Sequence, residues 1–304
     1  MVVGSYAVGL TLRAERWPVA GETVLASDFD QGPGGKGSNQ AIQVARLGGA
    51  VELVGVVGRD AFGDAAVELF EREGVGTRFL NRTPDRNTGV GFIVLDGAGE
   101  NRIVLDPGAN ALLSPEHVRD ALAGSGNADI VIAQLEIPLA TAAAALQLAS
   151  ARSTVTVLNP APAQPVEPEI LREVDIVTPN QPEARVLVGR MPDDPVDDRD
   201  VCAELLDAGV GTVVLTRGAL GALVVTRRGA TTVPAFEVEV VDSTGAGDAF
   251  NGALAASLAR GDGLEAAVVR ACAAGAHACT KLGVVAGLAY SDQVDALVQS
   301  TERA

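Results

Sequence analysis

The chain has 304 residues, 47% of them hydrophobic, which is enough for one large α/β domain with a sizeable core. Its net charge of −16 would repel nucleic acid and anionic membranes, so we expect neither as a partner. His117 and His277 are the only histidines and are too isolated for a histidine zinc site or a Ser-His-Asp triad. Cys202, Cys272 and Cys279 contain no C-x-x-C pair, which fits a reducing cytoplasm. The sequence predicts no signal peptide, and no apolar run reaches the ~18 residues that a membrane span needs.

Two segments near the N-terminus predict a small sheet outside the main layer. Residues 8–29 alternate loosely between apolar and polar side chains. Within residues 88–106, Thr88–Leu95 and Asn101–Leu105 flank the turn residues Asp96–Glu100 as a β-hairpin. We interpret this small sheet as a lid over a ligand site. An edge extension or a surface for homodimer formation is the alternative, and the two interpretations are compatible.

The rest of the chain predicts a doubly wound, mostly parallel sheet flanked by helices, within a single domain of residues 1–304. Apolar or β-branched runs predict buried strands at Met1–Val8, Val51–Val57, Asp129–Gln134, Thr154–Leu158, Asp175–Thr178 and Thr212–Thr216. Ala- and Leu-rich segments predict helices at Asp60–Glu73, Pro138–Ala151, Gln181–Leu187, Asp200–Ala208, Gly247–Ala259 and Leu264–Lys281. Met191–Asp200 predicts a solvated loop. Ligands of such a fold bind beyond the carboxyl ends of the parallel strands.

The first glycine cluster is Gly32–Gln40, which precedes the helical run Ala41–Leu47. It is not a Walker A loop, because Lys36 is followed by Gly37. One interpretation is a flexible turn with a helix cap. The other is a loop whose backbone amides approach a polyol closely while polar side chains bind its hydroxyls.

The second glycine cluster is Asp242–Gly252, which precedes a long run of small and apolar residues. Gly245 and Gly247 allow a sharp turn, and the unpaired amides at a helix N-terminus bind anions. Asp248, in the first turn, could take a proton from a hydroxyl that attacks a phosphoryl group. The alternative is an acidic residue that only stabilises a helix N-terminus. The residues of this cluster alone leave both interpretations open.

Gly34–Ala41 and Asp242–Gly252 resemble the two signature motifs of the ribokinase-like carbohydrate kinases of the phosphofructokinase B type. The likeness covers nearly the whole chain, because further landmarks occur in the family's order. These landmarks are Gly4-Ser5, Pro18 to Thr23, Thr88-Gly89, Gly108 to Asn110, Leu135 to Pro138, Asn159 to Ala163, Thr178 to Glu183 and Thr216 to Gly221.

The resemblance implies ATP-dependent phosphorylation of a hydroxyl, the primary one, of a small sugar. Asp248 matches the family's catalytic base, and the amides of Gly245, Ala246 and Gly247 match its anion hole. The residues that match the family's sugar ligands are Gly35, Lys36, Asn39 and Glu136. The residues that match its ATP site are Asn180, Thr216, Gly218, Gly221, Gly247 and Cys272.

The resemblance also implies two cation sites. Glu183 matches a residue that holds Mg²⁺ through water, although Asn180-x-x-Glu183 is equally a helix capping box. The residues that match a monovalent cation site are Asp242, Thr244, Ala278, Lys281 and Gly283. Gly287 stands where the family has a serine hydroxyl, so this chain lacks one oxygen that the family offers near the monovalent cation.

The chain departs from the family pattern at Ala7 and Gly9, which replace the Asn and Asp that hold ribose hydroxyls. A site that loses two such ligands changes its preferred sugar, so ribose itself is in doubt. Tyr6, Arg13 or Arg16 could supply replacement contacts.

Two rival functions stay open. Within the same fold, the rival is a nucleoside or sugar-phosphate kinase, for which the cationic side chains Arg13, Arg16 and Arg102 lie in or near the predicted lid. Outside the enzyme class, the rival is a noncatalytic sugar-binding protein.

Overall fold

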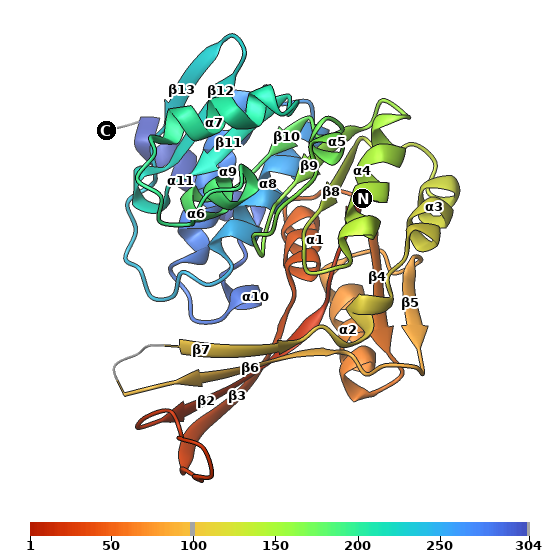
Figure 1. Ribbon diagram of the computed structural model, residues 1–304, viewed down its shortest axis with the longest axis vertical. Helices are drawn as coiled ribbons and strands as arrows, with labels where there is room; N and C mark the ends of the chain where they lie inside the picture. The colour runs from red at the N-terminus through yellow and green to blue at the C-terminus, as the bar shows by residue number, and fades with distance from the viewer. Residues whose placement is uncertain (98–100, 303–304) are drawn as a thin grey trace.

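Buried strands alternate with helices along most of the chain in the computed structural model, which describes residues 1–97 and 101–302 (Figure 1). The strands are β1 (Val2–Val3), β2 (Ala7–Ala14), β3 (Ala26–Gly34), β4 (Leu53–Gly58), β5 (Leu80–Thr83), β6 (Gly89–Leu95), β7 (Asn101–Asp106), β8 (Ile130–Ala133), β9 (Val155–Leu158), β10 (Ile176–Val177), β11 (Thr212–Thr216), β12 (Ala222–Thr226) and β13 (Gly229–Val233). The helices are α1 (Lys36–Arg46), α2 (Ala61–Glu73), α3 (Pro115–Gly124), α4 (Leu139–Ser150), α5 (Pro168–Leu171), α6 (Gln181–Leu187), α7 (Asp198–Asp207), α8 (Ala246–Ala259), α9 (Leu264–Ala278), α10 (Val284–Gly287) and α11 (Ser291–Glu302). Two 3₁₀ turns, η1 (Gly108–Leu112) and η2 (Gly218–Leu220), complete the set.

The main sheet has the strand order β13-β12-β11-β10-β9-β8-β1-β4-β5. From β11 to β5 every neighbouring pair is parallel, as the alternation of strands and helices predicts, although β5 itself is not among the predicted strands. The antiparallel edge formed by β12 and β13 is not predicted, because it is a local hairpin rather than a strand-helix-strand unit.

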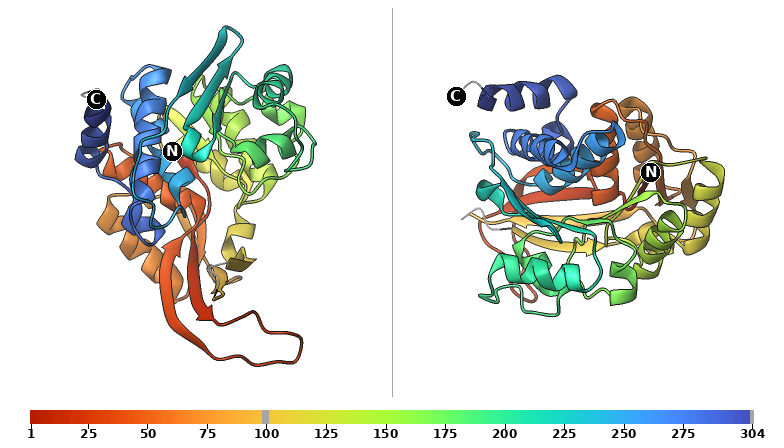
Figure 2. Two further views of the ribbon diagram at one scale, coloured as in Figure 1. Left: turned by 90° about the vertical axis from the view of Figure 1, so that its left-hand side faces the viewer. Right: turned by 90° about the horizontal axis from the view of Figure 1, so that it is seen from above.

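The two faces of the main sheet bury two separate hydrophobic cores. Along β1, Val2 enters one core and Val3 the other, which is the period-2 alternation of a strand covered on both sides. Apolar side chains of α1, α2, α8, α9 and α11 form the first core, and those of α3 to α7 form the second. Figure 2 shows these helices as layers on opposite faces of the sheet.

The predicted strand Met1–Val8 is wrong in its extent, because the chain changes sheets within it. β1 ends at Val3 and β2 begins at Ala7 in a second sheet. Gly4 makes this crossing beside α1, where a Cβ at Gly4 would lie 2.7 Å from Gly37 Cα. Because these two glycines lack side chains, the start of α1 packs closely against the segment that connects β1 to β2.

The second sheet has the order β3-β2-β6-β7 and extends away from the main body (Figure 1). β2 pairs antiparallel with β3 and parallel with β6, and β6 pairs antiparallel with β7. β3 continues to Gly34, beyond the predicted segment 8–29, so the first glycine cluster joins this sheet directly to α1. Residues 98–100 of the predicted hairpin turn lie outside the described residues. Within the described ranges, no helix is both long and apolar enough to cross a membrane.

Candidate active site

The turn before α8 needs glycine at its first position. Gly245 caps α8 with φ 83°, in the left-handed region, and a Cβ there would lie 2.4 Å from Val284 Cγ1. Gly247 has no atom within 4 Å of the position that a Cβ would take, so its backbone is open to a ligand. The N–H of Ala246 donates to Ser243 O at 3.2 Å, so this amide of the predicted anion hole is already engaged.

Asp248 lies in the first turn of α8 with only 6% of its surface exposed. Its Oδ2 accepts a hydrogen bond from Asn39 Nδ2 at 2.8 Å, and its Oδ1 accepts one from Gln40 Nε2 at 3.1 Å. Burial raises the pKa of Asp248, and the nearby Lys36 and these two amides offset this effect only in part. A buried carboxylate with a raised pKa is a better proton acceptor than an exposed one.

The predicted sugar ligands gather around Asp248. Glu136 Oε2 accepts hydrogen bonds from Ser5 Oγ at 2.6 Å and from Lys36 N at 2.9 Å. Gly35 precedes α1 with φ 92°, and a Cβ there would lie 2.7 Å from Tyr6 Cα. The absence of a side chain at Gly35 thus lets the start of α1 lie against the segment that connects β1 to β2.

The charge of Lys36 interacts with three acidic residues of the site. Burial alone lowers the pKa of Lys36, but three carboxylates together outweigh burial and raise it. These carboxylates are Asp248, Glu136 and Glu183. Lys36 therefore stays charged and partly neutralises a site that will receive an anion.

The predicted ATP ligands Asn180 and Thr216 lie at the carboxyl ends of neighbouring strands. Thr216 N donates to Pro179 O at 2.9 Å, and Thr216 pairs with Asn180 in an isolated parallel bridge. Gly218 and Gly221 follow with φ of 54° and 78°, so this turn uses backbone conformations that favour glycine.

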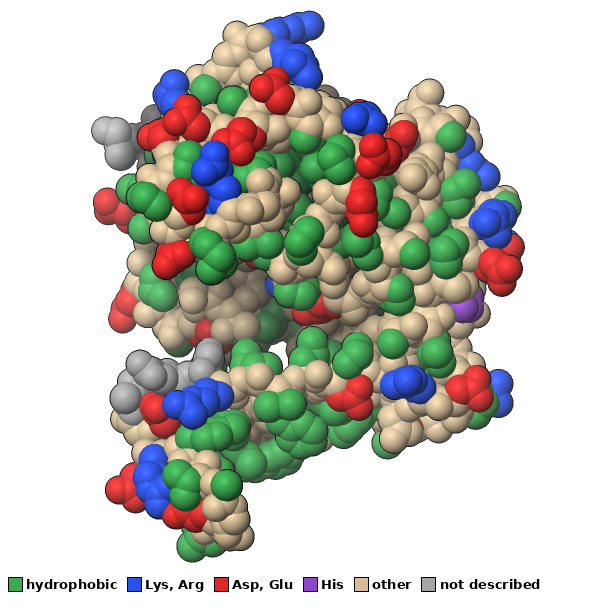
Figure 3. All heavy atoms as spheres, in the orientation of Figure 1, with side chains coloured by type: hydrophobic (Ala, Val, Ile, Leu, Met, Phe, Trp, Pro, Cys, Tyr) green, Lys and Arg blue, Asp and Glu red, His purple; other side chains and the backbone are tan. Residues whose placement is uncertain are grey.

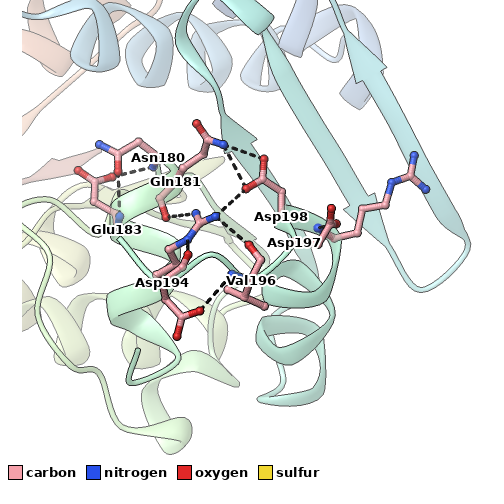
Figure 4. Close-up of polar contacts among 9 residues, drawn as sticks. Asn180, Gln181, Glu183, Asp194, Val196, Asp197 and Asp198 are labelled. Carbon is pink, nitrogen blue, oxygen red and sulfur yellow. Dashed lines mark hydrogen bonds and ion pairs between the residues drawn. The ribbon is translucent and has the colours of Figure 1, made fainter. Parts of the chain in front are cut away.

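The capping box at Asn180 and Glu183 is present (Figure 4). Asn180 Oδ1 accepts from Glu183 N, and Glu183 Oε2 accepts from Asn180 N, each at 2.8 Å. Burial raises the pKa of Glu183, while the bond from Asn180 N and the charge of Lys36 act in the opposite direction. The capping bond uses only Oε2 of the Glu183 carboxylate.

Arg185 holds the loop behind this helix start, a role that sequence reasoning missed. Its guanidinium donates to the carbonyl oxygens of Gln181, Asp194 and Val196 at 2.7–2.9 Å and contacts Asp198 Oδ1 at 3.2 Å. Figure 4 shows these acceptors converging from α6, the loop and α7. α7 begins at Asp198, so the predicted loop Met191–Asp200 is shorter than expected.

Most of the predicted monovalent cation site is brought together. Asp242 Oδ1 accepts from Thr244 N at 2.9 Å, and its Oδ2 accepts from Gly283 N at 3.2 Å. Burial alone would raise the pKa of Asp242, but these bonds outweigh it and lower the pKa. A Cβ at Gly287 would lie 2.7 Å from Ala278 O, which places these two residues side by side. Lys281 is exposed next to this group in the chain.

Cys272 lies buried in α9 among the small residues of the first core. Burial raises the pKa of its thiol to about 12, so the side chain is a neutral thiol at physiological pH. No contact of Cys272 assigns it to a nucleotide.

These site residues lie on a chain that a family model matches over residues 1–289, with the description pfkB family carbohydrate kinase. The chain belongs to the pfkB family of carbohydrate kinases. Two relatives are each 35% identical to it: ribokinase of Haemophilus influenzae, over 93% of this chain and 92% of that one, and deoxyribokinase of Salmonella typhi, over the same shares. The structure of Arabidopsis thaliana ribokinase complexed with ribose and ATP matches with a TM-score of 0.89 and 27% identity, covering 98% of this chain and 97% of the other. The ribokinase-like fold and the class of ATP-dependent sugar kinase follow from these matches.

In this pfkB-family kinase, the side chain of Tyr6, one of the three expected replacement contacts, packs into the first core. Only 3% of Tyr6 is exposed, and its ring packs edge-on against Phe70 with centroids 5.6 Å apart. Arg16 pairs with Glu22 within the loop that joins β2 to β3. Arg102 lies 5.6 Å from the centre of the Trp17 ring. Contacts with residues of the β2–β3 loop thus engage both arginines.

Sequence reasoning on this kinase also missed Gln40, Gln134 and Asn159, which form a buried amide chain behind Asp248. Gln40 lies within the first glycine motif, but a glutamine inside an otherwise regular helix gives no pattern that marks its partners. The partners follow strands that are distant in the sequence.

Proposed function

We propose that this kinase transfers the γ-phosphoryl group of ATP to a primary hydroxyl of a small sugar and that Asp248 accepts the hydroxyl proton. The hydroxyl oxygen forms the new bond to phosphorus, ADP leaves with the electrons of the broken bond, and the proton moves to Asp248. The observation that carries this proposal is the buried Asp248 carboxylate in the first turn of α8, beside the open backbone of Gly247. One base and one anion hole suffice for such chemistry, which is mainly positioning and charge neutralisation.

The residues present fit ATP and Mg²⁺. A Cβ at Gly218 or Gly247 would meet no atom within 4 Å, so phosphates or the ribosyl unit can approach the backbone at both places. We place the nucleotide along Asn180 and Thr216, which pair in one bridge, and we propose that its adenine lies beside Cys272. We assign Mg²⁺ to Glu183 through water, because the hydrogen bonds of the capping box occupy only one of its carboxylate oxygens. Bound ATP would supply the phosphoryl group, and Mg²⁺ held by Glu183 would neutralise part of its charge.

We further propose a monovalent cation, K⁺, at Asp242, Thr244, Ala278, Lys281 and Gly283. The lowered pKa of Asp242 keeps this carboxylate charged, and its neighbours in the chain offer backbone carbonyls. A kinase assay in K⁺ against one in a tetraalkylammonium salt tests this point: K⁺ should activate, and equal rates would contradict the assignment.

We propose that the acceptor differs from ribose. Gly9 pairs in register with Gly32 on β3 and Gly91 on β6, so this row across three strands presents no side chain. Ala7, which pairs with glycines on the same two strands, adds only a methyl group. The two curated relatives of equal identity carry the names of kinases for two different sugars, so identity alone does not fix the acceptor.

We propose that the small sheet is a lid that also mediates a homodimer. Phe92 and Val104 are register partners on adjacent strands, and each is more than half exposed. Figure 3 shows hydrophobic side chains gathered over this sheet. An exposed apolar face of this kind marks an interaction surface. Light scattering should give the mass of a dimer, and Val104→Asp should give a monomer; a monomeric wild type would contradict the proposal.

A cytoplasmic location is part of the proposal. Cys202, Cys272 and Cys279 are all free thiols, which persist in a reducing compartment.

A panel of sugars, nucleosides and sugar phosphates, assayed for ADP release, tests the proposed function. We expect release with at least one sugar and slower release with ribose. Release only with a nucleoside or a sugar phosphate would favour the rival kinase, and binding without release would favour a noncatalytic sugar-binding protein.

A further inference from the structure

Gln40 contacts the proposed base directly but is no part of the sugar site or the ATP site. Its side chain is completely buried, and its Nε2 donates to Asp248 Oδ1 at 3.1 Å and to Asn159 Oδ1 at 2.9 Å. Its Oε1 accepts from Gln134 Nε2 at 2.7 Å. Both hydrogens and the oxygen of this amide are therefore engaged, and only one orientation of the amide satisfies all three bonds.

The partners of Gln40 fix it to the main sheet. Gln134 follows β8 directly and Asn159 follows β9, so both stand at the carboxyl ends of neighbouring parallel strands. Asn159 Nδ2 reaches Thr178 O, after β10, at 3.4 Å. One buried series of amide hydrogen bonds thus joins the ends of β8, β9 and β10 to α1. This series ends at the hydrogen bond from Gln40 to Asp248.

A second branch fixes the helix that carries Asp248. Thr178 Oγ1 donates to Asn251 Oδ1 at 2.5 Å, and Asn251 Nδ2 donates to Gly247 O at 2.8 Å. The carboxylate and the first turn of α8 are consequently held against the same strand ends. Gln134 Oε1 is a buried oxygen without a partner, but both hydrogens and the oxygen of the Gln40 amide are bonded, so Gln40 itself is held in one position.

We propose that Gln40 is a positioning residue for phosphoryl transfer, which holds the Asp248 carboxylate in the orientation that accepts the hydroxyl proton. The proposal rests on the assignment of Asp248 as the base. Asn39 holds the other oxygen, Oδ2, so loss of Gln40 leaves the carboxylate free to turn about a single bond. Small errors in the placement of a catalytic group cost large factors in rate.

Loss of the Gln40 amide also changes the protonation of Asp248. The charged groups around Asp248 are Lys36, which lowers its pKa, and Glu136 and Glu183, which oppose its ionisation. The Gln40 bond lowers the pKa of Asp248 too, so its removal raises this pKa. A base must be deprotonated to act, and the acid limb of the kcat profile should therefore move to higher pH.

The test compares Gln40→Met with Gln40→Glu and with the control Gln43→Met. Gln43 is also fully buried on α1, but its amide bonds the backbone of Ala289 at 2.8 and 3.0 Å instead of Asp248. Each variant is assayed for kcat, for the KM of ATP and of the best acceptor sugar, and for melting temperature. If Gln40→Met does not fold, Gln40→Glu answers the same question, because it keeps an acceptor for Gln134 Nε2.

We expect Gln40→Met to lower kcat by about 10- to 100-fold with both KM values within about twofold of the wild type. The acid limb of its kcat profile should move up by about one pH unit. The acid limb of Gln40→Glu should move further, because a second carboxylate beside Asp248 opposes the ionisation of Asp248. Gln43→Met should keep the wild-type limb. Unchanged kcat and limb in a folded Gln40 variant, or the same shift in Gln43→Met, would overturn the proposal. Full activity of Asp248→Asn would instead overturn the assignment of the base on which it rests.

Discussion

Ser5 Oγ lies 2.6 Å from Glu136 Oε2, so the crossing between the two sheets and the loop after β8 are joined at the proposed sugar site. The N–H of Lys36 reaches the same oxygen at 2.9 Å. Within the described part of the chain, no donor contacts the other oxygen, Oε1. The Glu136 carboxylate is therefore oriented by the protein through one oxygen and offers the second to a ligand.

Glu136→Gln tests this division between the two oxygens. The amide oxygen can still accept from Ser5 and Lys36, while the ligand-facing acceptor becomes a donor. We expect the KM of the acceptor sugar to rise about tenfold with a smaller change in kcat and in the KM of ATP. Steady-state kinetics against both substrates measure this, and an unchanged sugar KM would remove Glu136 from the sugar site.

Ala7→Asn combined with Gly9→Asp should improve ribose as an acceptor. A Cβ at Gly9 would lie 3.6 Å from Ile93 Cδ1, an ordinary contact, so the backbone accepts a β-carbon there without a clash. We expect kcat/KM for ribose to rise about tenfold or more, because two hydroxyl ligands are gained. Gly9→Ala is the control, since it fills space without polar atoms and should give ribose no benefit. A folded double variant with unchanged ribose kinetics would refute this explanation of acceptor choice.

Gly245→Ala should destabilise the protein and impair transfer together. Its φ of 83° and the 2.4 Å approach of Val284 leave no room for a Cβ, so we expect a loss of about 1–3 kcal/mol in the free energy of unfolding. Gly263→Ala is the matched control, because Gly263 also caps a helix but has φ −64° and open space at its Cβ. Denaturant titrations of the two variants compare them; equal stability would show that the turn does not require glycine at 245.

Arg185→Met should weaken both stability and ATP binding. It removes the guanidinium donor from three carbonyl oxygens and the ion pair from Asp198, which keeps only its bonds from Gln181 Nε2, and this costs about 3 kcal/mol. Because α6 begins with the Asn180–Glu183 capping box, the KM of ATP should rise while that of the sugar stays constant. Arg172→Met, which removes an exposed pair with Glu169, should change the stability by less than about 0.5 kcal/mol. An unaltered KM for ATP in Arg185→Met would separate this loop from the nucleotide site.

The parallel part of the main sheet and the two glycine turns were predictable from sequence because their signals are local. Runs of β-branched residues mark strands that are covered on both faces. Gly35 and Gly245 both adopt left-handed φ, as glycines at sharp turns before helices do. The class of phosphoryl transfer chemistry follows from these local patterns and from the family resemblance.

The hydrogen-bond network that holds Asp248 was not predictable, because its residues are distant in the sequence. Gln40 lies 94 residues from Gln134 and 119 from Asn159, and only the stacking of strand ends brings them together. The position of the Tyr6 side chain likewise depends on tertiary packing, because its ring packs edge-on against Phe70 of α2. Tertiary contacts of this kind leave no period or spacing in the sequence.

Asp248→Asn tests the central claim most directly. Steady-state ADP release with the best acceptor should fall by about 10²- to 10⁴-fold, the usual contribution of a general base, because Asn cannot accept the hydroxyl proton. The dissociation constant of the sugar, measured by calorimetry, should stay within about threefold of the wild-type value, since the amide keeps the shape of the carboxylate. Turnover close to that of the wild type in a variant that still binds the sugar would contradict the assignment of Asp248 as the base.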